Sequence, residues 1–231
     1  MTYDLPATVP TVPVVPPPPL AVPARTSSRL AAACGVLSAV ALFVAVAAVD
    51  IPRHASEDEM LAWWRDGDNR TADVVSTFAL LASGLFFLGF LVHLVRRVGS
   101  YTEDAARLAQ HAGTAFVALL FVGGGVGGAV VRGLVVDDEP LPSADLLRFF
   151  AQVRYTTIGT FAMPAAAVVI GVASYAALRH GALPRWLGWL GVVCVVAIVA
   201  ATAAFVGQFA IPALLVWTIA ASVVLARTEN R

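Results

Sequence analysis

Three histidines are the side chains in this sequence best suited to bind a metal ion or a haem. His93, His111 and His180 lie near the ends of three different apolar segments, and these ends would face the same side of a membrane. A metal or haem site needs paired ligands in a defined geometry, with neighbours that orient them. None of these three histidines belongs to an HxxxH or HxxE pattern. We therefore interpret them as interfacial side chains, and an inner-face haem or metal redox protein is the last of three functional hypotheses.

A glycine cluster, Gly123, Gly124, Gly125, Gly127 and Gly128, is the most unusual local feature. Gly123 with Gly127, and Gly124 with Gly128, form two overlapping GxxxG registers on adjacent helix faces. Glycines at this spacing let the backbone of a neighbouring helix approach closely. The alternative is that the cluster unwinds the helix and exposes carbonyl groups to an ion. We favour close packing, and we expect this face to be the one that would form a homo-oligomer.

Two prolines fall inside apolar segments, and proline inside a helix removes a hydrogen bond and bends the chain. We therefore expect hinges at Pro164 and Pro212. Neighbouring polar side chains such as Gln208 would line a small cleft there, which favours a facilitator or transporter for a small apolar or weakly polar solute as the second hypothesis. The middle third of every expected span lacks Asp, Glu, Arg and His, which argues against a pump or a proton-coupled carrier.

The composition excludes most soluble classes of protein. Of the 231 residues, 59% are hydrophobic and 13% are charged, against about half and about a quarter in a typical soluble domain. The 15 basic residues, all Arg, balance 15 acidic residues, so no basic field favours nucleic acid. The two cysteines, Cys34 and Cys194, both lie in apolar runs and form no disulfide framework. We expect lipid as the main partner, no cofactor and no enzymatic activity.

The apolar runs predict an all-α, polytopic transmembrane helix bundle. A helix needs about 20 apolar residues to cross a bilayer, and a turn at Gly207 and Gln208 divides the last long run into two such segments. The first run has a core too long for a cleaved signal peptide. The sequence therefore predicts six spans, at about 30–49, 74–95, 108–131, 157–178, 186–206 and 209–226.

Two short amphipathic helices are expected in the outer loops, at 57–65 and 143–154. Ser56 and Glu59 have the spacing of a capping box before the first of them. Trp63 and Trp64 follow, and tryptophan is favoured at the level of the lipid headgroups. The sequence thus predicts that both helices lie in the membrane interface on the outer side.

Charge sorting predicts the orientation. If the N-terminus is cytoplasmic, the inner segments hold nine Arg and four acidic residues, and the outer segments hold six Arg and eleven acidic residues. Basic residues are more frequent in cytoplasmic loops. We therefore expect a multi-pass protein of the plasma membrane with both termini in the cytoplasm. Arg96, Arg97, Arg185 and Trp186 would then anchor the inner interface.

Three regions follow from this organisation: a tail at 1–28, a six-helix domain at 29–227 and a short cytoplasmic tail at 228–231. Eight of the 14 prolines lie in the first tail, which favours a disordered or polyproline-II segment. We interpret it as a disordered spacer. The alternative is a ligand for the aromatic-lined groove of a protein partner.

The junction between the fourth and fifth spans carries a resemblance. The run from Gly181 to Gly188 has the pattern G-x-L-P-R-W-L-G. It resembles the junction of small six-helix membrane proteins of unknown function that are abundant in actinobacteria. The resemblance implies a bacterial membrane protein and no activity or site residue. Our first hypothesis is therefore a non-enzymatic membrane scaffold or envelope-associated partner.

Overall fold

The computed structural model describes residues 24–52, 56–137 and 139–228. Every regular element in these residues is a helix, as the sequence predicts. In chain order they are α1 (Ala24–Ala47), α2 (Glu57–Arg65), α3 (Gly67–Gly99), α4 (Glu103–Val135), α5 (Ala144–Thr156), the π-helix η1 (Thr157–Ala162), α6 (Met163–His180), α7 (Arg185–Ala203), the 3-10 helix η2 (Gly207–Ala210) and α8 (Ile211–Thr228).

Five helices are long and apolar enough to cross a membrane. They are α3, α4, the continuous helix Ala144–His180, α7 and the segment Gly207–Arg227. The first expected span lies in α1, whose apolar part in the described residues is the shorter stretch Ala32–Ala47. By length, the described chain therefore confirms five of the six predicted spans. The prolines of the expected tail lie outside the described residues, and α1 already begins at Ala24.

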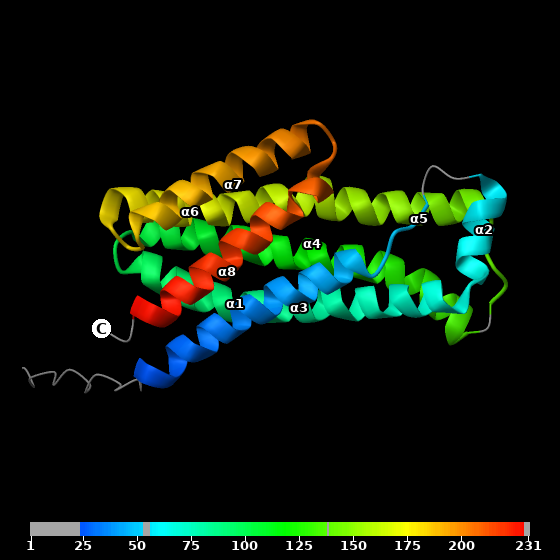
Figure 1. The fold of residues 1–231 in the computed structure, drawn as a ribbon, viewed down its shortest axis with the longest axis horizontal. Coiled ribbons are helices and arrows are strands. Elements are labelled where there is room, and N and C mark those ends of the chain that lie inside the picture. The colour runs from blue at the N-terminus through cyan, green and yellow to red at the C-terminus, as the bar shows by residue number, and fades with distance from the viewer. Residues whose placement is uncertain (1–23, 53–55, 138, 229–231) are drawn as a thin grey trace, which may run out of the picture.

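Three helices are longer than a bilayer requires. Helices α3 and α4 have 33 residues each, and the continuous helix Ala144–His180 has 37. At 1.5 Å per residue they are about 50–55 Å long, against about 30 Å of hydrocarbon. Figure 1 shows that α3, α4 and α5 extend past the α7–α8 turn and past the end of α1, and that α2 lies across their ends. We call α2 and these helix ends the head.

The second amphipathic helix differs from the prediction. Residues 144–156 form α5, which does not lie in the membrane interface but continues through η1 into α6. No proline and only one glycine, Gly159, occur between Ala144 and Ala162, so nothing ends the helix there. The apolar side of α5, with Leu147 and Ala151, packs inside the head. The expected start of the fourth span at residue 157 is therefore the middle of one long helix.

Two hydrophobic cores stabilise the described chain. The larger core runs through the bundle and includes Phe87, Phe90, Phe116 and Trp217. The smaller core lies in the head, between α2, α4, α5 and the segment that follows α1. Its buried residues are Val49, Ile51, Met60, Trp64, Val130, Val131, Ala144, Leu147 and Ala151.

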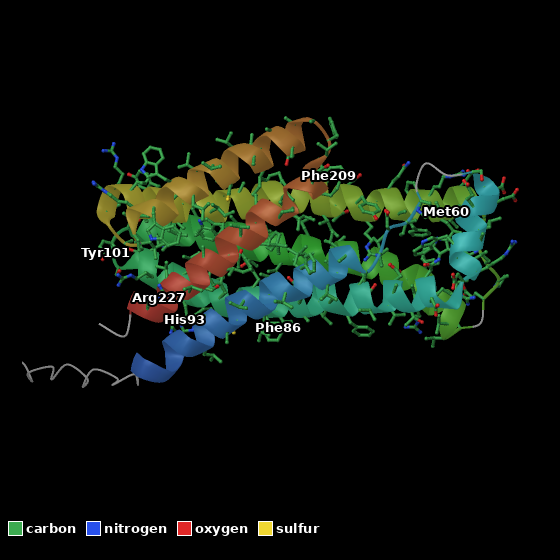
Figure 2. All side chains as sticks on the ribbon, viewed as in Figure 1. Met60, Phe86, His93, Tyr101, Phe209 and Arg227 are labelled. Carbon is green, nitrogen blue, oxygen red and sulfur yellow. The ribbon has the colours of Figure 1, made fainter. Side chains whose placement is uncertain are left out.

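The other end of the bundle carries most of the arginines, so we call it the arginine end. Figure 2 labels His93, Tyr101 and Arg227 there, with Met60 in the head at the opposite end. Helix α6 ends at Gly181, which has a left-handed φ of 68° and lets the chain turn into α7. Nε of Arg97 donates to the carbonyl oxygen of Ala182 at 2.9 Å, which ties α3 to this turn.

Candidate site at the junction of head and bundle

A buried ion pair joins three helices where the head meets the bundle. Nη1 of Arg154, in the last turn of α5, donates to Oδ1 of Asp73 on α3. Nη2 of Arg154 donates to Oγ of Ser76 at 2.6 Å, and that hydroxyl donates to the carbonyl oxygen of Ala45 on α1 at 2.6 Å. Asp73 and Ser76 are fully buried, and Arg154 is 6% exposed. The network therefore fixes α1, α3 and α5 against one another.

Two glycines of α4 make room for this network. A Cβ atom at Gly127 would lie 2.6 Å from Nη1 of Arg154, and one at Gly123 would lie 2.8 Å from Cγ1 of Ile158. Any side chain at these positions would push α5 and η1 away from α4. Gly123 and Gly127 thus let the helix Ala144–His180 pack closely on α4, and Gly127 leaves room for the guanidinium group of Arg154.

The second glycine register faces α3. A Cβ atom at Gly124 would lie 3.5 Å from Cβ of Leu80, and one at Gly128 would lie 3.0 Å from Cγ2 of Thr77. A Cβ atom at Gly125 would meet nothing within 4 Å. Helix α4 stays helical through all five glycines. Four of them pack against neighbouring helices of the same chain, and none unwinds the helix to expose carbonyl groups.

A cavity of about 350 Å³ lies beside the ion pair. Its wall is mostly apolar, but the lining includes the polar residues Asp50, Arg154, Tyr155 and Gln208. Val46 of α1 and Phe209 of η2 both line the cavity and are 44% and 75% exposed, so the cavity is open on the side of these two residues. The lining residues are Ala45, Val46, Val49, Asp50, Leu80, Arg154, Tyr155, Ile158, Gln208, Phe209 and Ile211.

A close backbone contact places Gln208 at this cavity. A Cβ atom at Gly207 would lie 1.9 Å from the carbonyl oxygen of Gly159, so η1 and η2 touch through their main chains. Pro164 is the second residue of α6, which follows η1 directly. Its ring would collide with the carbonyl of Thr160 in an ordinary α-helix, and the wider π-turn before it avoids that collision. Single π-turns often mark functional sites.

The second expected hinge lies at the start of α8. Pro212 is the second residue of this helix, a position at which the missing N–H group of proline is tolerated. The segment Gly207–Arg227 changes there from a 3-10 helix to an α-helix, and a kink at Pro212 stays a prediction. The predicted turn at Gly207 and Gln208 is present as η2.

The three histidines lie on three different helices and form no metal site in the described part of the chain. No group of three or more His, Cys, Asp and Glu side chains there has the proximity to hold a metal ion. The ring of His180 packs edge-on against Tyr175, with centroids 5.6 Å apart. The redox hypothesis gains no support from this arrangement.

The expected interfacial anchors divide between the two ends. At the arginine end, Trp186 is 55% exposed and Arg96 is exposed, as an anchor requires. In the head, Trp64 is only 3% exposed and contacts Trp63 edge-on at 5.0 Å between centroids. The indole of Trp64 packs on the protein core of the head rather than on lipid. The capping box is present, since the amide of Ser56 donates to Glu59 at 2.9 Å and the amide of Glu59 to Ser56 Oγ at 3.4 Å.

Sequence reasoning missed Asp73 and Arg154 as a pair. Both residues counted as charges of the solvated outer segments, because each lies beside an apolar run rather than within it. The sequence did contain one signal. An apolar helical run follows each of these two charges, and a small residue lies close to each charge, Ser76 after Asp73 and Gly159 after Arg154. The pairing itself depends on tertiary contacts between residues 81 positions apart.

The apolar helices indicate an integral membrane protein, helical throughout the described residues, with the head at one end of the bundle. Searches against models of protein families, curated proteins and solved structures find no match to the chain. The site is therefore interpreted from its own geometry.

Proposed function

We propose that this protein is a six-span, non-enzymatic scaffold of the bacterial plasma membrane, with both termini in the cytoplasm and the head on the outer side. The observation that carries the proposal is the head itself. Three helices extend beyond the length that a bilayer needs, and their ends enclose a separate hydrophobic core. A rigid platform held outside the membrane suits the binding of an envelope partner.

The charge distribution supports this orientation. The head carries exposed acidic side chains at Glu57, Asp58, Asp66 and Asp68. The opposite end carries most of the arginines, and basic residues are favoured on the cytoplasmic side. A partner that binds the head would present basic groups to this acidic surface.

The bundle supports a scaffold better than a facilitator. Its interior is filled by large buried side chains, among them Phe87, Phe90, Phe116 and Trp217. Phe87 contacts Phe116 at 4.9 Å between ring centroids, and Phe90 contacts Trp217 at 6.4 Å. The cavity beside Arg154 is lined by none of these four side chains. A solute would have to separate packed helices to pass further, and interiors packed in this way resist deformation.

Labelling of single cysteines tests the orientation. In a variant with both native cysteines replaced, Asp58→Cys places a thiol in the head and Tyr101→Cys places one at the arginine end. We expect a membrane-impermeant maleimide to label Asp58→Cys in intact cells and Tyr101→Cys only after permeabilisation. The reverse pattern would refute the orientation, and labelling of both in intact cells would refute a crossing of the membrane by α3, which lies between the two positions.

Crosslinking tests the scaffold role. A photo-reactive amino acid at Asp58 should yield a discrete crosslinked partner in cells. The same amino acid at Val193, which is 65% exposed on the lipid-facing side of α7, is the matched control and should crosslink to lipid. The absence of any discrete product from four or five exposed head positions would contradict the scaffold.

The relationship to the actinobacterial six-helix proteins remains a proposal. Its support is the junction between α6 and α7, where Pro184 precedes the first turn of α7 and Trp186 is exposed. The same arrangement is expected wherever a helix enters a membrane.

A further inference from the structure

The cavity beside the ion pair lies next to the turn between α7 and the segment Gly207–Arg227. These two helices have 19 and 21 residues, about the length that crosses a bilayer, so we expect their turn and the cavity to lie where the membrane meets water. The end of α1, the turn at η2 and the junction of α5 with η1 meet there, and Figure 1 shows the head beginning just beyond them. Exposed Phe205 and Phe209, at 77% and 75%, flank the turn in the way that aromatic side chains do at membrane interfaces. A molecule in this cavity can therefore contact lipid on one side and headgroup water on the other.

Arg154 lines the cavity and has more hydrogen-bond donors than its two acceptors use. The guanidinium of Arg154 has five N–H donors. Among the described residues, the structure gives it two acceptors, Asp73 and Ser76. The side chain of Arg154 is buried, at 6% exposure, and lines the cavity. Its remaining N–H groups can therefore donate hydrogen bonds to the acceptor oxygens of a ligand. Phosphate oxygens match a guanidinium group well.

The mouth of the cavity has the opposite character. Asp50, which follows the last turns of α1, is exposed and lines the cavity. Behind the guanidinium, Asp73 already balances the charge of Arg154. Asp50, Arg154 and the buried Asp73 behind it together carry one excess negative charge, which disfavours a purely anionic ligand. A ligand that joins a phosphate to a primary ammonium satisfies both ends.

We propose that the cavity binds the headgroup of a zwitterionic phospholipid with a free amine, of the phosphatidylethanolamine class. The phosphate lies toward Arg154, and the ammonium group lies toward Asp50 and Gln208. About 350 Å³ is at the small end of the range for ligand sites, so it holds the headgroup and the first chain atoms. The acyl chains leave between Val46 and Phe209, where the wall is open to lipid. The assignment to the outer leaflet rests on the proposed orientation, but the binding itself does not.

The test measures lipid binding by the purified full-length chain in detergent, by native mass spectrometry. The probes are phosphatidylethanolamine and phosphatidylglycerol with identical acyl chains. We expect the chain to bind phosphatidylethanolamine about tenfold more tightly, the effect of one added charge-assisted contact. Equal binding of the two lipids, or tighter binding of phosphatidylglycerol, would overturn the proposal.

Variants locate the site. Val46→Trp fills the mouth of the cavity and should abolish the preference, whereas Val40→Trp is a matched control on the same helix that is 50% exposed and does not line the cavity. Asp50→Asn should reduce the preference to about equal binding without weakening phosphatidylglycerol. If Val46→Trp keeps the preference while its thermal midpoint equals that of Val40→Trp, the ligand does not occupy this cavity.

A third probe distinguishes a lipid from a free headgroup. Glycerophosphoethanolamine carries the same phosphate and amine but no acyl chains. We expect it to bind at least about a hundredfold more weakly, because the apolar wall contributes nothing to its binding. Binding as tight as that of the lipid would refute a lipid ligand. Cysteine labelling reports on the orientation independently, so failure of one proposal leaves the other measurable.

Discussion

Removing either partner of the Asp73–Arg154 pair should strongly destabilise the protein. Arg154→Met leaves a fully buried carboxylate without its cation, and Asp73→Leu leaves a guanidinium that is 6% exposed without its anion. Loss of one partner of a buried pair costs about 3–5 kcal/mol, whereas replacing both by apolar side chains is often near neutral. The double variant Asp73→Leu with Arg154→Met should therefore recover most of the lost stability.

The size of the effect sets the assay. For a chain of this length, about 1 kcal/mol shifts the midpoint of thermal unfolding by about 2–4 °C, so each single variant should lose about 6–20 °C. Tryptophan fluorescence of the purified protein in detergent reports on both cores, because Trp64 lies in the head and Trp217 in the bundle.

A matched pair at the surface provides the control. Arg107 and Glu103 form an ion pair whose side chains are 66% and 76% exposed. Exposed pairs contribute about 0–1 kcal/mol, so Arg107→Met should shift the midpoint by less than about 4 °C. A single variant at Asp73 or Arg154 that loses no more than this control would refute the assigned role of the pair. A double variant that loses the sum of the two single losses would show that the two residues act independently.

Three further predictions use the close contacts and the cap of α2. Gly127→Ala should cost about 1–3 kcal/mol of stability, because its Cβ atom would lie 2.6 Å from the guanidinium of Arg154. Gly125→Ala should be neutral or stabilising by up to about 1 kcal/mol. Thermal unfolding compares the two variants, and equal losses of stability would contradict the packing role of Gly127. Gly207→Ala should cost about 3 kcal/mol or more, since the new Cβ atom would meet a carbonyl oxygen at 1.9 Å, and a normal midpoint would show that η1 and η2 do not touch. The backbone amide and the hydroxyl of Ser56 donate to Glu59 and lower its pKa below the usual value. The capping box therefore stabilises α2 at pH values above the usual pKa of glutamate, and this stabilisation is lost as the pH falls through the lowered pKa. Glu59→Gln should remove this acid dependence, whereas Ser56→Ala should only reduce it, because the backbone amide of residue 56 still donates to the carboxylate. The fluorescence of Trp64 against pH measures both effects, and an unchanged profile in Glu59→Gln would contradict the prediction.

The elements of the membrane part could be predicted because lipid imposes simple rules on the sequence. A run of about 20 apolar residues between charges forms a helix, since no other arrangement satisfies its backbone in hydrocarbon. Helices α3, α4 and α7 follow from such runs. The capping box at Ser56 and Glu59 predicts the start of α2 for a local reason, because both of its hydrogen bonds lie within one turn.

The head could not be predicted in the same way. Residues 144–156 carry enough polar side chains to resemble a surface helix, and their apolar stripe fits a membrane interface as well as a protein core. Only the ends of α3 and α4, which are distant in sequence, decide between the two environments. The same holds for Trp64, whose indole suits the lipid interface but lies in the core of the head at 3% exposure.

The candidate site was missed because its chemistry arises from position rather than from residue pattern. Arg154 and Asp73 are unremarkable charges beside apolar runs in the sequence, and Gly127 leaves the space on α4 that the guanidinium of Arg154 occupies. The glycine cluster, in contrast, was recognised from its spacing. Gly123 and Gly127 pack against the long helix Ala144–His180, and Gly124 and Gly128 pack against α3. The long helix contains Arg154, which lines the cavity. The small residues of α4 thereby determine where the only buried ion pair of the described residues lies, and that pair separates the core of the bundle from the core of the head.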